Sequence, residues 1–451
     1  MTELTKGNLT EGSITGTMLR FAWPLMLGNL LQQCYNIADT LIVGRVLGAE
    51  ALAAVGSSYT LLIFITSIFI GLCMGCSAVF SMQYGAGDLK ALRQSIYSSV
   101  LLVGGTTLLL NAASLVWLSP IIRLLQTPAE IVDLTYRYLF IILLGMIPVG
   151  IYNFYAFLLR AVGNSVVPLL FLAVSVVLNI GLDLLFVVGI RMGVEGAALA
   201  TVIAQSIAAG GILLYTRIRF PELNLTRSDC VVKAQSLKRV ASYAFLTCVQ
   251  QSVMNFGILM VQGLVNSFGT RVMAAFAAAV KIDSFAYMPV QDFGNAFSTF
   301  VAQNYGAGRA ERIRRGIRSA VWVTTAFSLA VSAIVYGTAP ALMKIFVAPE
   351  ETEIIAIGTE YLRIEGSFYV GIGYLFLLYG LYRAVCLPSM SVVLTVISLG
   401  TRVALAYALA AVPGIGYTGI WWAVPIGWAL ADIVGVAYYR HIRQRLYRIA
   451  L

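Results

Sequence analysis

Long apolar stretches alternate with short polar ones along almost the whole chain. We count twelve apolar segments, each long enough to cross a bilayer as a helix. They cover residues 18–43, 52–82, 93–118, 132–158, 166–189, 194–216, 240–266, 272–302, 316–340, 355–382, 389–411 and 418–439. The ten-residue alternation of a membrane β-barrel is missing from the sequence. Because backbone groups in lipid must then be satisfied within helices, the pattern predicts an all-α polytopic membrane protein with twelve transmembrane helices.

Composition agrees with this prediction, and the charge distribution adds an orientation. Of 451 residues, 59% are hydrophobic and 11% charged, whereas soluble domains carry about 25% charged residues. If the N-terminus is cytoplasmic, 21 of the 30 lysines and arginines fall on the cytoplasmic face, as the positive-inside rule requires. We therefore expect both termini in the cytoplasm. Topology explains the net charge of +10, so we expect no nucleic-acid partner.

An internal repeat divides the helices into two sets of six. Tyr84-Gly-Ala-Gly87 recurs as Tyr305-Gly-Ala-Gly308, and Arg160-Ala-Val162 recurs as Arg383-Ala-Val385. The first pair is 221 residues apart and the second 223. Six helices per half make the halves parallel repeats, an architecture typical of transporters with a central cleft. We expect an N-lobe at 1–216, a cytoplasmic linker at 217–239, a C-lobe at 240–439 and a basic tail at 440–451.

Residues for catalysis or a resident cofactor are missing from the sequence. The single histidine, His441, lies in the basic tail, and no Gly-Lys dipeptide is present to form a phosphate-binding loop. Cys73 and Cys76 have metal-ligand spacing but lack a second pair, which favours small buried residues. We expect a protein that is not an enzyme and has no cofactor.

Ionisable residues inside the apolar segments are the candidates for function. Asp39 lies about four residues from the outer end of the first segment, Asp183 about six from the outer end of the fifth, and Thr201 about seven into the sixth. Asn179 precedes Asp183 by four residues and shares its helix face. Four oxygen-bearing side chains thus lie at similar depth, as a proton or Na⁺ site requires. Alternatively, Asp39 is an interfacial side chain, and Asn179 and Asp183 are a polar pair that packs a helix.

The second half carries a different set of polar residues. By the repeat spacing, Met260 replaces Asp39 and Arg402 replaces Asn179. Lys281, Asp283 and Asp292 lie in the eighth segment. These charges either neutralise one another and hold helices together, or they line a cavity that contacts substrate.

The assembled features resemble the MATE family, the multidrug and toxic compound extrusion antiporters. The resemblance covers essentially the whole chain. Its motifs are the stretch Asn36–Gly56, which begins Asn-Ile-Ala-Asp-Thr-Leu-Ile-Val-Gly, the two Tyr-Gly-Ala-Gly turns, Leu178-Asn-Ile-Gly-Leu-Asp183, Gly196–Thr201 and Arg160–Asn164.

This resemblance implies a monomeric exporter of small cationic amphiphiles in a bacterial or archaeal inner membrane, driven by inward H⁺ or Na⁺. In the DinF-like branch, a coupling site matches Asp39, Asn179, Asp183 and Thr201, and a bending first-helix proline matches Pro24. The resemblance and the polar pattern together assign the substrate cavity. Its expected residues are Gln32, Tyr35, Asn36, Asn153, Gln251, Lys281, Asp283, Asp292 and Arg402.

One departure separates the chain from the NorM-like branch, which places acidic residues in helices seven and ten. Here Gln251 stands in helix seven, and helix ten has no acid around Gly371–Gly373. A C-lobe cation site is therefore not expected. The alternative function is a flippase for lipid-linked oligosaccharides or peptidoglycan precursors, which belongs to the same superfamily. Such proteins tend to have extra helices and a strongly basic cavity.

Overall fold

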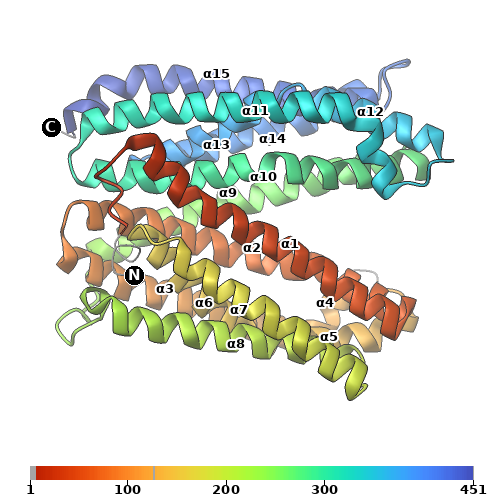
Figure 1. Ribbon diagram of the computed structural model, residues 1–451, viewed down its shortest axis with the longest axis horizontal. Coiled ribbons are helices and arrows are strands. Elements are labelled where there is room, and N and C mark those ends of the chain that lie inside the picture. Colours follow the sequence, from red (N-terminus) through yellow and green to blue (C-terminus); the bar gives the residue numbers. More distant parts are fainter. Residues whose placement is uncertain (1–6, 125–126, 450–451) are drawn as a thin grey trace. The chain divides into compact units, whose positions relative to one another are not determined.

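A computed structural model describes residues 7–124 and 127–449, and every regular element in this part of the chain is a helix (Figure 1). Within these described ranges, nine single helices and two bent pairs are long and apolar enough to cross a membrane. The prediction of an all-α, polytopic protein with twelve membrane helices is confirmed. The remaining predicted span is α1, whose middle is rich in Asn and Gln.

The elements of the first repeat are α1 (Ile14–Leu47), α2 (Ala49–Gly85), α3 (Leu89–Val116), α4 (Leu118–Leu124), η1 (Ala129–Ile131), α5 (Val132–Leu144), α6 (Met146–Ala161), α7 (Val166–Asp183), η2 (Leu184–Gly189), α8 (Val194–Arg219) and η3 (Pro221–Leu223). Those of the second are α9 (Ala234–Asn266), α10 (Thr270–Gly306), α11 (Ala310–Phe346), α12 (Thr352–Gly366), α13 (Tyr369–Ala384), α14 (Pro388–Ala410) and α15 (Thr418–Ile449).

The fourth and tenth predicted segments are each broken into two helices. The break between α5 and α6 bends the segment by 45°, and the break between α12 and α13 bends it by 52°. Gly145 lies at the first break with Pro148 just after it, and glycine and proline are common causes of kinks. Phe368, at the second break, follows Gly145 by 223 residues. The bend is therefore a shared feature of the two repeats.

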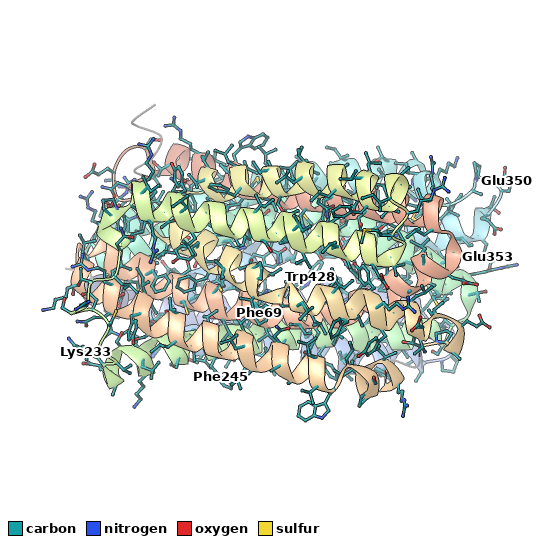
Figure 2. All side chains as sticks on the ribbon, turned by 90° about the horizontal axis from the view of Figure 1, so that it is seen from below. Phe69, Lys233, Phe245, Glu350, Glu353 and Trp428 are labelled. Carbon is teal, nitrogen blue, oxygen red and sulfur yellow. The ribbon has the colours of Figure 1, made fainter. Side chains whose placement is uncertain are left out.

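Large apolar side chains point outward as well as inward. Phe69 is fully buried in the core of the first repeat, whereas Phe245 is 66% exposed (Figure 2). Along α11, Leu329, Ile334 and Ile345 are likewise exposed. Surfaces of this kind are stable against lipid rather than water, so this is a multi-pass membrane protein.

The chain folds into two compact units, and two helices contribute to both. The first unit is built mainly from Trp23–Cys248, and the second from Leu9–Ala22 together with Val249 onward. The start of α1 therefore belongs to the second unit, although the rest of α1 belongs to the first. Helix α9 is divided in the opposite sense: its part up to Cys248 belongs to the first unit, and its part from Val249 belongs to the second. In α1 the division falls immediately before Pro24.

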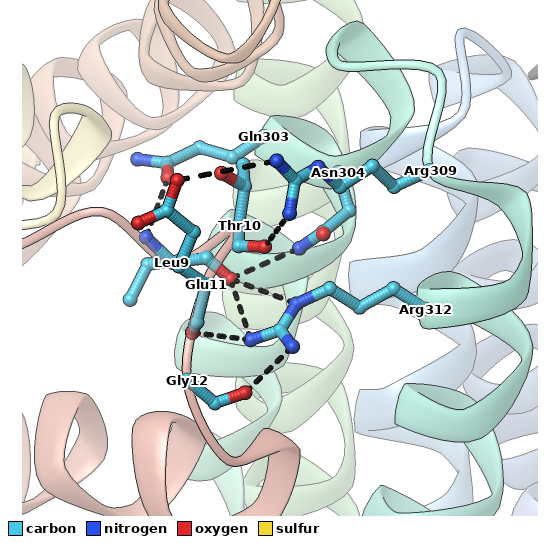
Figure 3. Close-up of polar contacts among 8 residues, drawn as sticks. All are labelled: Leu9, Thr10, Glu11, Gly12, Gln303, Asn304, Arg309 and Arg312. Atoms are coloured by element: carbon cyan, nitrogen blue, oxygen red, sulfur yellow. Dashed lines mark hydrogen bonds and ion pairs between the residues drawn. The ribbon is translucent and has the colours of Figure 1, made fainter.

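Within the second unit, the irregular segment Leu9–Gly12 is held by side chains around the α10–α11 turn (Figure 3). Arg312 donates to three of its carbonyl oxygens, at 2.6 to 3.4 Å. Arg309 and Asn304 donate to this backbone as well, and Gln303 accepts the Leu9 N–H at 3.1 Å. Backbone groups outside a helix need such partners when they are buried. We call Leu9–Gly12 the N-terminal clasp.

The repeat spacing reappears in contacts of the two shared helices. In the second unit the hydroxyls of Thr15 and Ser319 are 2.6 Å apart. In the first unit Ser98 and Ser236, each 221 residues away from its counterpart, are 3.4 Å apart. The start of α1 thus packs on α11, and the start of α9 packs on α3, which is the equivalent of α11 in the other repeat.

The segment between α8 and α9 folds against the first unit. Sequence predicts a linker at 217–239, whereas α8 runs to Arg219 and α9 begins at Ala234. Arg93 on α3 forms an ion pair with Asp229 at 3.1 Å. The hydroxyl and N–H groups of Thr226 both donate to Asp229, which lowers the pKa of this carboxyl group, and Arg93 acts in the same direction. At the other end, the predicted basic tail continues α15 to Ile449, and residues 450–451 lie outside the described residues.

Candidate ion-coupling site

Helices α1 and α7 carry the two carboxylates on which the predicted site depends. Asp39 lies on the part of α1 that belongs to the first unit, and Asp183 is the last residue of α7. Directly after Asp183 the chain widens into the π-helical turn Leu184–Gly189. Such turns are rare and frequently occur at functional sites. Here the turn changes the helical register immediately beyond the carboxylate.

The two carboxyl groups lie within hydrogen-bonding reach of each other. Asp183 is fully buried, and Oδ1 of each residue is buried without a donor from the protein. Two ionised carboxylates are both acceptors, so they cannot bond to each other directly. A shared proton or a bound cation would satisfy both groups.

Neutral polar side chains from these two helices and from α8 complete the site. With the Asn179 amide oriented to satisfy its neighbours, its nitrogen donates to Asp183 Oδ2 at 2.9 Å, and its oxygen accepts from Thr201. Tyr35 Oη is 3.2 Å from the Thr201 hydroxyl. The depth count from the sequence therefore brought together four side chains that also meet in space, and Tyr35 joins them.

A small cavity lies beside these groups. Its volume is about 10 Å³, enough for a single water molecule. Tyr35, Asn179 and Thr201 line it together with Gln32, Ser175 and Gln205. It has room for an ion or a water molecule but not for a drug-sized molecule.

Three polar residues near the site were missed by sequence reasoning. Ser175 precedes Asn179 by one helical turn, and Gln205 follows Thr201 by one turn, so the i,i+4 rule could have found both. Tyr138 on α5 is buried and lies close enough to interact electrostatically with Asp39 and Asp183. In the sequence only the repeat marks it, because Tyr138-Leu139 recurs 223 residues later as Tyr361-Leu362.

Two predicted cavity residues of the first unit make contacts within their own helices. Asn153 donates to the carbonyl of Val149 in its own helix at 2.8 Å. Asn36 Nδ2 is 3.5 Å from Gln33 Oε1, also within one helix. Neither lines the small cavity.

In the second unit a buried charged cluster forms around Asp283. The Tyr369 hydroxyl donates to Asp283 Oδ1 at 2.8 Å. Glu365 is 1% exposed and lies within hydrogen-bonding reach of Asp283, and Arg402 interacts with both carboxyls. Helix ten has no acid around Gly371–Gly373, as expected, but Glu365 lies at the end of α12, directly before the break. Counting depth along the whole tenth segment would have found it.

The other predicted residues of the second unit do not join this cluster. Lys281 is exposed, whereas Asp283 is buried. Side chains two residues apart point about 200° apart on a helix, so these two side chains lie on opposite faces of α10. Asp292 is buried on α10, nine residues and about 13 Å along the helix from Asp283. Gln251 is half-buried on α9. Of the two basic residues expected in these helices, Arg402 therefore interacts with Asp283, whereas Lys281 lies on the opposite face of α10.

Buried carboxylates on membrane helices in two repeats are typical of a membrane transporter, and the family and relatives of this chain are transporters rather than enzymes. The chain belongs to the MatE family, whose sequence profile matches residues 24–185 and 244–408. It is 29% identical over 445 residues to the probable multidrug resistance protein YpnP of Bacillus subtilis, covering 98% of both chains. It is 28% identical over 429 residues to the probable multidrug resistance protein NorM of Thermotoga maritima, covering 92% of this chain and 89% of that protein. A solved transporter of the MOP superfamily from Pyrococcus furiosus has the same fold, with a TM-score of 0.91, 23% identity and 98% of both chains covered.

Proposed function

We propose that this protein is a secondary antiporter that exports small cationic amphiphiles by alternating access, in exchange for H⁺ or Na⁺ bound between Asp39 and Asp183. The relatives named as multidrug resistance proteins support the substrate class. The buried carboxylate pair carries the proposal for the coupling ion.

The chemistry of the pair supports exchange rather than simple binding. A buried carboxylate costs about 3 kcal/mol to insert into a membrane, and two facing carboxylates repel each other unless a positive charge lies between them. Binding of H⁺ or Na⁺ removes that repulsion and favours the arrangement in which α1 and α7 approach. Because a ligand shifts an equilibrium only through differential affinity, this preference links ion binding to a conformational change. Pro24, nearer the start of α1, supplies a place for the helix to bend.

The distribution of basic residues supports the direction of transport. With both termini cytoplasmic, the sites near Asp39 and Asp183 lie toward the outer ends of their helices. An external ion then enters the pair from the outer side, and a substrate loaded from the cytoplasm leaves on that outer side.

The test is transport of a fluorescent cation in proteoliposomes, with a pH gradient and a Na⁺ gradient imposed separately. We expect one of the two gradients to drive transport by the wild type, and Asp39→Asn to abolish it without lowering the melting temperature. Thr40→Ala, which changes an exposed side chain next to Asp39 on the same helix and outside the small cavity, is the matched control. Normal coupled transport by Asp39→Asn would refute the role of the pair.

The flippase alternative receives less support. A pyrophosphate-binding cavity needs uncompensated basic groups, whereas Arg402 interacts with both Asp283 and Glu365. Movement of a fluorescent lipid-linked pyrophosphate, without movement of the cation, would favour the flippase.

A further inference from the structure

A groove opens along the second unit between α11, α12 and α15. Its volume is about 730 Å³. The 52° bend between α12 and α13 carries α12 away from the line of α13, which opens the space. The groove is lined mainly by Tyr336 and Pro340 of α11, Thr359, Glu360 and Arg363 of α12, and Trp422 of α15.

The walls of the groove are aromatic and exposed. Tyr336, Phe368 and Trp422 all expose a large part of their rings, and the rings of Phe368 and Trp422 lie 5.8 Å apart between centroids. In the inner wall Thr359 is only 8% exposed, and its hydroxyl oxygen has no hydrogen-bond partner. Apolar walls with an unsatisfied hydroxyl favour a long, mostly apolar ligand that carries polar groups.

Two opposite charges line the groove without pairing to each other. The Arg363 guanidinium lies 5.4 Å from the centre of the Tyr336 ring, and it forms no ion pair with any described residue. Glu360 accepts a hydrogen bond from the Thr418 hydroxyl at 3.2 Å. Because Glu360 and Arg363 are three positions apart on α12, their side chains share a face of that helix.

The depth of these charges matches the membrane interface. Thr418 is the first residue of α15, so Glu360 lies level with the end of that helix. Arg363 and Trp422 lie about one turn deeper. Tyrosine and tryptophan concentrate at this level in membrane proteins, next to the lipid headgroups.

We propose that this groove is a specific site for one phospholipid with a zwitterionic phosphoethanolamine headgroup. Arg363 binds the phosphate as a charge-assisted donor, and Glu360 binds the ammonium group. The acyl chains lie against Tyr336, Phe368 and Trp422. A headgroup with only negative charge would gain the Arg363 contact but would face repulsion from Glu360, which favours the zwitterion. The site is independent of the proposed antiport.

Native mass spectrometry of the purified full chain tests this proposal. The probes are dioleoyl-phosphatidylethanolamine and dioleoyl-phosphatidylglycerol, added at equal concentration. We expect the wild type to retain one phosphatidylethanolamine at least five-fold better than phosphatidylglycerol. Arg363→Ala should lose this retention. Arg271→Ala is the matched control, because it removes an exposed arginine of the same unit that pairs with Glu353 outside the groove.

A second variant tests the headgroup assignment. Glu360→Gln should weaken retention of phosphatidylethanolamine and strengthen that of phosphatidylglycerol, because the repulsion is removed. Equal retention of both lipids by the wild type, or equal loss in Arg363→Ala and Arg271→Ala, would overturn the proposal. The melting temperature of each variant shows whether a lost lipid adduct reflects unfolding. Trp422→Ala shortens the apolar wall without changing charge, so it should lose both lipids equally.

Discussion

Substituting Gly75 tests how closely the shared helix α9 packs in the first unit. Gly71 and Gly75 lie one turn apart on α2 and form a small-residue interface of the kind that lets membrane helices approach closely. A Cβ atom built on Gly75 would lie 2.4 Å from the carbonyl oxygen of Tyr243 and 2.6 Å from the Cα atom of Ala244. Both are backbone atoms, so no rotamer change relieves the clash. In Gly75→Ala the two helices must therefore move apart.

The magnitude follows from two opposing effects. Replacing glycine by alanine in a helix stabilises it by about 1 kcal/mol, whereas forcing extra volume into a packed interface costs about 1–3 kcal/mol. Gly56 supplies the matched control, because it lies in the same helix and a Cβ atom there meets nothing within 4 Å. Gly56→Ala should therefore be neutral or stabilising. Gly75→Ala should be less stable than Gly56→Ala by about 1–3 kcal/mol.

The assay is thermal unfolding of the three proteins in one detergent, followed by tryptophan fluorescence. The melting temperatures should fall in the order Gly56→Ala, wild type, Gly75→Ala. A Gly75→Ala protein that melts at or above Gly56→Ala would show that α9 does not approach α2 as closely as described. Gly71→Ala, whose Cβ atom would lie 2.6 Å from the Cα atom of Cys248, should repeat the Gly75→Ala result.

Three further predictions concern charged residues. Asp183→Asn removes one acceptor of the carboxylate pair, so gradient-driven transport in proteoliposomes should stop while binding of a fluorescent cation persists; loss of binding instead would point to misfolding. Arg312→Ala removes the donor to three carbonyl oxygens of the N-terminal clasp, which should lower the local stability of the clasp by about 1.5–3 kcal/mol. Proteolysis of the clasp should therefore be faster in Arg312→Ala, whereas Arg314→Ala, which changes an arginine that pairs with Glu311, should leave the proteolysis rate unchanged. Because the pKa of Asp229 is lowered in the folded chain, its stabilising effect is present above the ordinary pKa of about 4 and is lost as pH falls through the lower folded value. Hydrogen exchange of residues 220–233, corrected for intrinsic rates, should thus quicken in acid for the wild type, and Asp229→Asn should be fast already at neutral pH and lack this acid-induced rise.

The membrane helices could be predicted from the sequence because each apolar stretch is long and bounded by charges. The two bends could not, since an average over an apolar window is the same for a straight helix and a broken one. Gly145 and Pro148 signal the first bend, but no proline accompanies the break at Phe368.

Residues that helical geometry grouped in the sequence also meet in the structure, whereas some that were grouped only by proximity along the chain do not. Asn179 and Asp183 share a face because they are four residues apart, and the structure brings Thr201 to them. Lys281 and Asp283 were grouped by proximity along the chain, although two residues place side chains on opposite sides of a helix. Glu365 was missed because only the residues after the break were considered.

The division of α1 between the two units has a consequence for synthesis of the chain at the ribosome. Gly12 and its partner Arg312 are 300 residues apart. At translation rates of 5–20 residues per second, about 15–60 s pass between the synthesis of the two residues. During that interval the clasp and the first turns of α1 have no Arg312 to hold them. Completion of the first unit is delayed in the same way but for a shorter time, because this unit includes Ala234–Cys248 of the following repeat. The beginning of this protein is therefore among the last parts to reach its final place.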